Sequence, residues 1–471
     1  MATTSAIAQP RRSLWSSLLE AVRGTEQDFT EGSISRAIFL LAIPMVLEML
    51  MESLFAIVDV FWVTRLGANA IATVGLTESM MTIVFSVAFG MALSTTAMVA
   101  RRIGEKEPRA AASASAQAIL LGVGVAALMA IPGFLLAPKL LVLMGAPPDL
   151  VATGHHYAAI VFGSSVIVML LFLNNAIFRG AGDASVAMRV LWVSNLINLS
   201  LDPCFIFGLG PFPKMGVTGA AVSTLTGRTI GVLYQFWILT RGHTRVQIHP
   251  SDWRVVPRAM GSLARVSATG VTQFIVAHIS WIALVRMISS FGSVAVAGYT
   301  IGIRIFVFVI LPAWGLSGAA ATMVGQNLGA KKPERAQRAV WMTVTYNMLF
   351  LGLVGVAFVS APGFIAGVFT SDPRVLAFAI DCLRIVGYGN LTYAFGMVML
   401  QAFNGAGDTV TPTVINTIGF IFMEIPLAWA LAYPAHLQVR GVFASIPIAE
   451  GLIALMGLFM FTRGKWKQRK I

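Results

Sequence analysis

The stretch Ile38–Trp62 reads IFLLAIPMVLEMLMESLFAIVDVFW and decides the fold class of this chain. If helical, it is long enough to cross a bilayer with some tilt. The stretch nevertheless carries three carboxylates, on Glu48, Glu52 and Asp59. At about 100° per residue, these three positions fall within roughly a 40° arc of one helix face.

An acidic stripe on a membrane helix needs a polar environment. Each acid near the bilayer centre costs about 2.5–3.5 kcal/mol, so three on one face indicate a bundle interior or a water-filled cavity. The alternative for a single acid, such as Glu48 or Asp59, is a place near a membrane interface, beside solvent or a basic residue. That alternative does not account for the whole stripe, which we therefore predict to be functional.

The composition indicates a polytopic membrane protein. Hydrophobic residues make up 57% of the chain and charged residues only 11%, which is outside the balance of a soluble globular protein. The net charge of +13 does not indicate nucleic-acid binding, because the basic residues collect between the hydrophobic segments, as the positive-inside rule requires. Cys204 and Cys382 lie in apolar stretches and supply neither a disulfide framework nor metal-binding spacing.

Twelve hydrophobic segments are long enough to span a membrane. Their approximate limits are 38–62, 74–100, 112–137, 153–177, 186–209, 216–240, 263–289, 294–324, 339–366, 376–400, 411–433 and 442–462. The loops on one side hold most of the basic residues, among them Arg11, Arg12 and Lys470. The opposite loops hold little beyond Arg65, Lys139, Lys214, Arg374 and Arg440. We therefore expect a multi-pass protein of the inner (cytoplasmic) cell membrane with both termini in the cytoplasm.

The chain repeats itself at a constant sequence offset. FRGAGD at Phe178 recurs as FNGAGD at Phe403, and IGEKEP at Ile103 recurs as LGAKKP at Leu328, the same distance further along. An offset that carries an even number of spans gives two halves in parallel topology, and substrate sites in such proteins lie between the halves. We therefore predict an all-α fold with two homologous six-helix bundles. The expected units are a cytoplasmic tail at 1–35, an N-terminal bundle at 36–240, a linker at 241–262, a C-terminal bundle at 263–462 and a basic tail at 463–471.

The N-terminal tail has two readings from its sequence. Residues 14–22 could form a short amphipathic helix on the membrane surface, or the tail could be partly ordered.

The acids do not follow the repeat. Asp59 and Asp202 correspond to Leu284 and Leu427, so the fold alone does not require a carboxylate at either place. We therefore expect the N-terminal half to hold a polar site that the C-terminal half lacks.

The fifth and sixth spans supply further polar groups to this site. Asn198 and Asp202 lie four residues apart on one helical face, and Thr224 follows in the sixth span. With the acids of the first span they offer carboxylate, amide and hydroxyl oxygens, which suit a proton relay or Na⁺. Taken singly, Thr224 is better explained by a helix–helix hydrogen bond than by a place in the site. For Asn198 alone, these two explanations are equally good. If Asp59 and Asp202 approach each other, they titrate as one coupled unit.

Other polar residues carry weaker signals. Asn175 either lines the same lobe or caps a turn. Snorkelling or local pairing is expected for a further group, namely Arg286, Arg304, His278, Gln401 and Glu424. No Ser/His/Asp, Cys/His or HExxH arrangement stands out, so we do not expect an enzyme.

Several runs of the sequence resemble the multidrug and toxic compound extrusion (MATE) transporters, particularly their DinF-like prokaryotic branch. These runs are AIPM (Ala42–Met45), VDVFWVTRLG (Val58–Gly67), ARRIG (Ala100–Gly104), FRGAGD, NLSLDPCFIFGLG (Asn198–Gly210) and GVTGAAVST (Gly216–Thr224). The resemblance covers residues 35–462 and is strongest in the first six spans. It implies two six-helix bundles around a V-shaped cavity. It also implies antiport of organic cations and other drugs against H⁺ or Na⁺, with no other cofactor.

The resemblance also implies roles for individual residues. Those that match the ion-coupling positions of the branch are Asp59, Asn198, Asp202 and Thr224, which would also hold Na⁺ if that is the ion. We expect the substrate path to include Glu52, Glu48, Trp62 and Asn175, with Trp62 as a stacking surface. Phe55 and Glu52 replace a Tyr and a Gln of the branch. The seventh- and tenth-span acids of the NorM-like branch have no clear counterpart, since His278 and Tyr393 lie near those places, so ion coupling through the C-terminal half is not expected.

Two other classes of membrane protein remain as alternatives. A flippase for a lipid-linked or polar metabolite predicts a cavity dominated by basic residues, and a channel or membrane-embedded interaction protein predicts no proton movement on substrate addition. The expected partners are small organic cations or drugs and the lipid bilayer, without nucleic acid, and the protein is expected to be a monomer.

Overall fold

The computed structural model describes residues 14–24, 27–242 and 244–469. Within these ranges the secondary structure is helical, without strands. Arg11, Arg12 and Lys470, which contributed to the predicted orientation, lie outside the described residues. Within the predicted N-terminal tail the structure shows a helix, α1 (Leu14–Arg23), and its place on the membrane surface stays a prediction.

The remaining helices follow the predicted segments closely. The N-terminal half contains α2 (Ile34–Thr64), α3 (Ala68–Gly104), α4 (Pro108–Leu135), α5 (Ala137–Leu143), α6 (Pro148–Gly163), α7 (Ser165–Ala181), α8 (Ala184–Phe207) and α9 (Val217–Arg241). After η1 (Pro250–Trp253), the C-terminal half contains α10 (Pro257–Ser289), α11 (Ser293–Gly329), α12 (Pro333–Ser360), α13 (Pro362–Gly367), α14 (Pro373–Tyr388), α15 (Asn390–Gly405), α16 (Val410–Asn416), η2 (Thr417–Glu424), α17 (Ile425–Ala432), α18 (Gln438–Thr462) and η3 (Lys465–Gln468). η2 is a π-helix, and it joins α16 to α17 in one span.

Length and composition make ten of these segments able to cross a membrane, with α6 and α7 counted as one. An eleventh is the pair α14 and α15, which is bent by 56°. α9 has 25 residues and packs against α8, but it is not among these segments. It includes the polar residues Arg228 and Gln235. Counting α9 gives the twelve spans predicted from the sequence.

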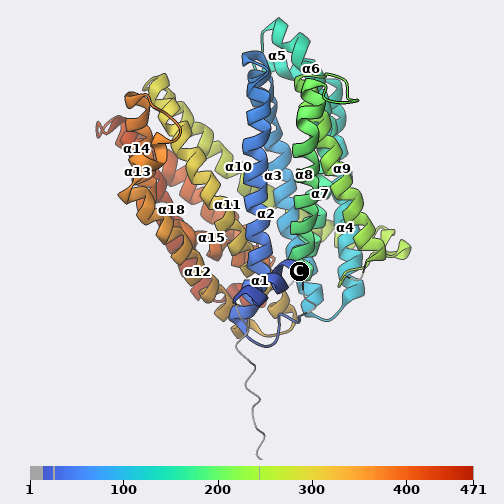
Figure 1. The fold of residues 1–471 in the computed structure, drawn as a ribbon. Coiled ribbons are helices and arrows are strands. Elements are labelled where there is room, and N and C mark those ends of the chain that lie inside the picture. Colours follow the sequence, from blue (N-terminus) through green and yellow to red (C-terminus); the bar gives the residue numbers. More distant parts are fainter. Residues whose placement is uncertain (1–13, 25–26, 243, 470–471) are drawn as a thin grey trace, which may run out of the picture.

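The helices form two groups, α2–α9 and α10–α18 (Figure 1). The groups lie together at the end that carries α1 and diverge toward the end that carries α5 and α6, which gives the V shape implied by the sequence resemblance. At the closed end α2 packs against α11, and α3 packs against both α10 and α11.

The predicted repeat is present in the backbone. α3 and α11 begin and end at positions related by the offset of the sequence repeat, at Ala68 and Ser293 and at Gly104 and Gly329. The same offset relates three pairs of residues with positive φ. These pairs are Gly67 and Gly292 (97° and 102°), Lys106 and Lys331 (60° and 59°), and Gly182 and Gly407 (90° and 79°). The two halves therefore share their turns as well as their helices.

Close backbone contact joins the halves at the closed end. A Cβ atom at Gly104 of α3 would clash with the carbonyl oxygen of Gln326 on α11. The side chains of Gln326 and Thr322 donate hydrogen bonds of 3.0 Å to the carbonyl oxygens of Gly180 and Arg179. Gly104 thus allows the backbones of α3 and α11 to meet directly, while two side chains of α11 hydrogen-bond to the backbone of α7.

Gly104→Val is expected to destabilise this closed end. Overpacking a close contact costs about 1–3 kcal/mol, so the population should shift away from the conformation in which the halves touch here. Energy transfer between fluorophores on the α6 and α14 ends would report the shift. Gly124→Val is the matched control, because a Cβ atom at Gly124 meets nothing within 4 Å. Equal effects of the two substitutions would contradict the expectation.

Candidate functional site

The three acids of α2 face the other helices of the N-terminal half. Glu48 is buried, and its Oε1 accepts a hydrogen bond of 3.0 Å from Asn175 on α7. Arg179 of α7 lies 3.3 Å from the same oxygen. Glu48 is therefore paired with a basic residue, as the alternative considered from the sequence proposed. Asn175, in turn, accepts a 2.7 Å hydrogen bond from Gln235 of α9, so it links three helices.

Glu52 and Asp59 lie further along the same face. Glu52 accepts a 3.3 Å hydrogen bond from Asn195 of α8, and its carboxylate lies 4.0 Å from the guanidinium of Arg228 on α9. Asp59 is half-buried and forms no hydrogen bond with any residue that the structure describes. The charged groups that act on Asp59 are Asp202, Glu78 and Arg228. The structure therefore brings Asp59 and Asp202 into electrostatic contact.

Asn198 is the centre of the polar cluster between α8 and α9. Its amide nitrogen donates to Thr224 at 3.0 Å and lies 3.4 Å from Asp202 Oδ1. The hydroxyl of Ser223 donates a short hydrogen bond to that same Asp202 oxygen. α9 can approach this closely because of Gly227, where a Cβ atom would lie 2.6 Å from the Ser194 carbonyl oxygen. The three predicted residues of α8 and α9 are thus brought together by direct hydrogen bonds.

Two oxygens of this cluster lack a hydrogen-bond donor. Asn198 Oδ1 and Asp202 Oδ2 are both buried, and neither has a hydrogen-bond partner within the described ranges. A buried acceptor without a donor costs about 1–3 kcal/mol, more if it is charged, so a proton or a cation bound beside these two oxygens would stabilise the site. No group of three His, Cys, Asp or Glu side chains suitable for a metal occurs in the described part of the chain. A sodium ion here would therefore depend on the amide and hydroxyl oxygens as well as the carboxylates.

Three residues of this site were not predicted from the sequence. Ser223 was passed over in favour of its neighbour Thr224, although Ser223 contacts the carboxylate. Arg228 follows Thr224 by four residues and could have been found from that helical spacing. Tyr157 of α6 is buried and interacts electrostatically with both Asp59 and Asp202. No local sequence pattern connects α6 with α2 and α8.

Trp62 lies in an aromatic cluster near the diverging end. Its ring is 5.1 Å from Phe61 and 6.0 Å from Phe207 in edge-on geometry, and the Arg65 guanidinium lies 5.1 Å from the ring centre. The protein therefore supplies a cation of its own to this ring, and a role of Trp62 in stacking on substrate stays a prediction.

The C-terminal half also contains buried acids, so the expectation that it lacks a polar site was wrong. Glu424 is buried at the end of η2, where Ser280 of α10 donates a hydrogen bond to it. Glu450 of α18, which the sequence did not single out, is also buried. Glu424 was expected from the sequence to snorkel or to pair locally, whereas Glu450 does not occupy a position that the repeat pairs with Asp59 or Asp202. Among the lesser candidates Arg286 and Arg304 are exposed, whereas His278 and Gln401 line a cavity.

Ser223→Ala is expected to weaken ion coupling. A hydrogen bond to a charged group contributes about 1.5–3 kcal/mol, so loss of the Ser223 hydroxyl should lower coupled exchange about tenfold or more. Proton flux in proteoliposomes would measure the change. Ser200→Ala is the control, because the Ser200 hydroxyl is exposed and bonds only to a backbone carbonyl of its own helix. Unchanged flux in Ser223→Ala would remove Ser223 from the site.

Comparison with known proteins gives matches over nearly the whole chain. The family model described as MatE matches residues 44–204 and again residues 269–430. A probable multidrug resistance protein NorM of Thermotoga maritima is 27% identical over 454 residues, which cover 93% of this chain and 94% of the relative. An FAD transporter of Shewanella oneidensis is 24% identical over 435 residues, which cover 91% and 95%.

Similarity to a solved structure also extends over nearly the whole chain. A crystal structure of MATE in complex with MaL6 has a TM-score of 0.88 at 25% identity, and the match covers 94% of this chain and 99% of that one. The twofold match of the family model also falls on the two halves related by the repeat.

Proposed function

Because this chain belongs to the multidrug and toxic compound extrusion (MATE) family of transporters, we propose that it exports organic cations and other toxic compounds in exchange for H⁺ or Na⁺. The observation that carries the proposal is the pair of buried oxygens without donors, Asn198 Oδ1 and Asp202 Oδ2, beside the half-buried Asp59. Such a set is satisfied when a cation is bound and is costly when it is not, which suits a site that must load and unload.

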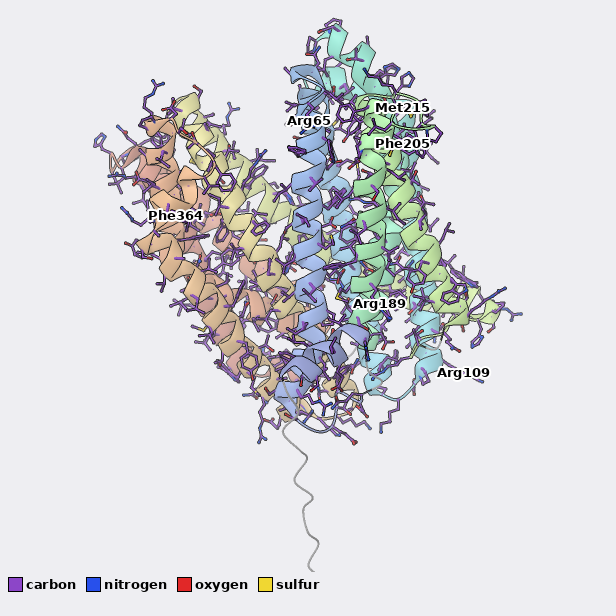
Figure 2. All side chains as sticks on the ribbon, in the orientation of Figure 1. Arg65, Arg109, Arg189, Phe205, Met215 and Phe364 are labelled. Atoms are coloured by element: carbon purple, nitrogen blue, oxygen red, sulfur yellow. The ribbon has the colours of Figure 1, made fainter. Side chains whose placement is uncertain are left out.

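The distribution of basic residues supports an orientation for this transport. Figure 2 shows Arg109 and Arg189 toward the end that carries α1 and Arg65 near the diverging end of α2. By the positive-inside rule the α1 end is cytoplasmic, so the diverging end opens to the outside of the cell membrane. In this conformation the site exchanges ions with the exterior. Closure of the diverging end and separation at the contact of α3 with α11 then expose the site to the cytoplasm.

Within the site, Asp59 and Asp202 have different roles. Asp202 is held by Ser223 and Asn198, so its position is fixed. Asp59 has no such support among the described residues and can take up the exchanged ion directly. Thr224 completes the set by fixing the amide of Asn198, whose oxygen then points away from the hydroxyl.

The other acids of α2 are each balanced by an arginine. Glu48 pairs with Arg179, and Glu52 lies near Arg228. We propose that Glu52 and Asn175 line the substrate path with Trp62, whereas Glu48 acts through Arg179, which lines a cavity between the halves. The path is then less acidic than the sequence alone indicates.

A second candidate is export of an anionic compound. One relative is an FAD transporter, and Arg179 lines the cavity between the halves of this chain. This candidate is weaker here because Glu48 already pairs with that guanidinium.

Purified protein in liposomes, loaded with a pH-sensitive dye, tests the proposal. Ethidium or tetraphenylphosphonium should drive proton movement without Na⁺ if the ion is H⁺, and only with Na⁺ present if the ion is Na⁺. Transport of FAD with neither organic cation transported would favour the second candidate. Absence of any ion movement with any of the three compounds would overturn exchange altogether.

A further inference from the structure

A cavity of about 400 Å³ lies within the C-terminal half. Residues of α10, α11, α15, α16, η2 and α18 line it together with Leu93 of α3, and its aromatic members are Phe274, Trp314, Tyr393 and Phe420. The volume is within the range of pockets that hold small organic ligands, about 300–1,000 Å³, and is far larger than one inorganic ion requires. A second cavity, between the halves, shares Phe274 and Trp314 with it, so the two spaces adjoin.

One buried carboxylate lines this cavity, and a second one interacts with it electrostatically. Glu450 lines it directly and is 8% exposed, and its carboxylate has no hydrogen bond or ion pair with the residues described by the structure. Glu424 is 4% exposed and interacts electrostatically with Glu450. Both carboxylates also interact electrostatically with Tyr393. The only imidazole in the lining is His278, with Nδ1 2.9 Å from the Phe274 carbonyl oxygen, and no Lys or Arg is part of the lining. The cavity is therefore acidic.

A separate observation points to a ligand. Three amide side chains line the cavity with a buried oxygen that has no donor in the described part of the chain. They are Gln273, Asn404 and Asn416, which are 8%, 2% and 6% exposed. All three orphaned atoms are acceptors, as are the carboxylates. A cavity lined by unsatisfied acceptors is completed by a donor or a positive charge, and an anion would leave every one of them unpaired.

The aromatic side chains are arranged as a rigid wall. The ring centres of Phe274 and Trp314 lie 5.7 Å apart, and the ring centre of Phe89 on α3 lies 5.2 Å from each of them. Aromatic faces attract organic cations, most strongly when water is excluded. η2, which ends at Glu424 and contributes Phe420, is a π-helix, and such turns occur frequently at functional sites.

We propose that this cavity in the C-terminal half is the binding pocket for the cargo, a monovalent organic ammonium or phosphonium compound with aromatic substituents. Glu450 neutralises the cation, with Gln273, Asn404 and Asn416 available to its N–H groups, and Trp314 and Phe274 pack against its rings. The inference rests on the proposed function and deepens it. Cargo and coupling ion bind in different halves, so they communicate through the shared conformation and not by competing for one carboxylate.

Ethidium binding to the full-length protein in nanodiscs tests the assignment. Glu450→Gln keeps the shape of the side chain and removes its charge, so the dissociation constant should rise about tenfold or more. Glu334→Gln is the matched control in the same half, because Glu334 is exposed and pairs with Lys467 on the surface. Trp314→Leu is a second variant and should weaken ethidium binding through loss of ring contact. Thermal unfolding of each variant shows that the fold is retained.

Asp59→Asn separates the halves in the same assay. It should weaken ethidium binding less than Glu450→Gln does, because its effect on cargo passes only through the conformational equilibrium. Wild-type affinity in Glu450→Gln, or a larger loss in Asp59→Asn than in Glu450→Gln, would overturn the inference.

Two further arms distinguish the other outcomes. If Na⁺ stabilises the wild type but not Glu450→Gln, while ethidium binding is the same in both, the cavity holds an inorganic ion and the cargo assignment is wrong. If the wild type exchanges ions for ethidium but Glu450→Gln does so equally well, this inference fails and the proposed function stands. A wild type that binds neither ethidium nor tetraphenylphosphonium overturns both.

Discussion

Asp59→Asn is expected to reduce cargo-driven ion exchange to the rate of protein-free liposomes. Asp59 is the member of the site whose carboxylate has no hydrogen-bond partner among the described residues, so it is free to take up and release the exchanged ion. Asparagine has nearly the same volume but cannot carry a proton or a negative charge at neutral pH. The loss should therefore be in exchange and not in folding.

Proton flux in proteoliposomes, with and without Na⁺, measures this effect, and thermal unfolding confirms that the variant is folded. Asp149→Asn is the control, since Asp149 is an exposed acid at the start of α6 in the same half. Exchange at the wild-type rate in Asp59→Asn would remove Asp59 from the coupling site. Loss of exchange in both variants would show that the effect is not specific to the buried aspartate.

Arg179→Met is expected to produce the largest loss of stability. Its guanidinium lies 3.3 Å from Glu48, which is 1% exposed, and the second Glu48 oxygen already lacks a partner in the described part of the chain. Removing one member of a buried ion pair leaves the other uncompensated, which costs about 3–5 kcal/mol. Asn175 still donates one hydrogen bond to Glu48, but it cannot supply the missing charge.

The thermal unfolding midpoint of the purified protein reports this cost. The double variant Glu48→Gln with Arg179→Met removes both charges and should recover most of the lost stability, because no unpaired ion remains. If the double variant is as unstable as Arg179→Met alone, the cause is lost packing of the arginine stem and not the unpaired carboxylate.

Much of the fold could be predicted because its signals are local or strictly periodic. Spans follow from runs of apolar residues, and the constant offset of the sequence repeat relates α3 to α11 residue by residue. The polar pair of α8 could be predicted because Asn198 and Asp202 are one helical turn apart on a single span. α9, predicted at 216–240, has the polar residues Arg228 and Gln235 within its apolar run, because both face partners inside the bundle.

The contacts between helices could not be predicted in the same way. Which of two neighbours, Ser223 or Thr224, reaches Asp202 depends on the rotation of α9 against α8 by a fraction of a turn. The C-terminal cavity takes its polar groups from α10, α15, α16 and α18, and each contributes isolated amides or a single acid. Such a group looks like ordinary helix packing in the sequence, and only the tertiary arrangement makes it a pocket.

If the N-terminal carboxylates exchange a cation for cargo, binding of cargo displaces that cation. Ethidium is added to the protein in weakly buffered nanodiscs, and released protons are followed with a dye and released sodium with a radioactive tracer. The wild type should release one of the two ions, and Asp59→Asn should release markedly less of it while still binding ethidium. Ethidium binding that displaces neither ion from the wild type, or equal displacement from the variant, would contradict this exchange.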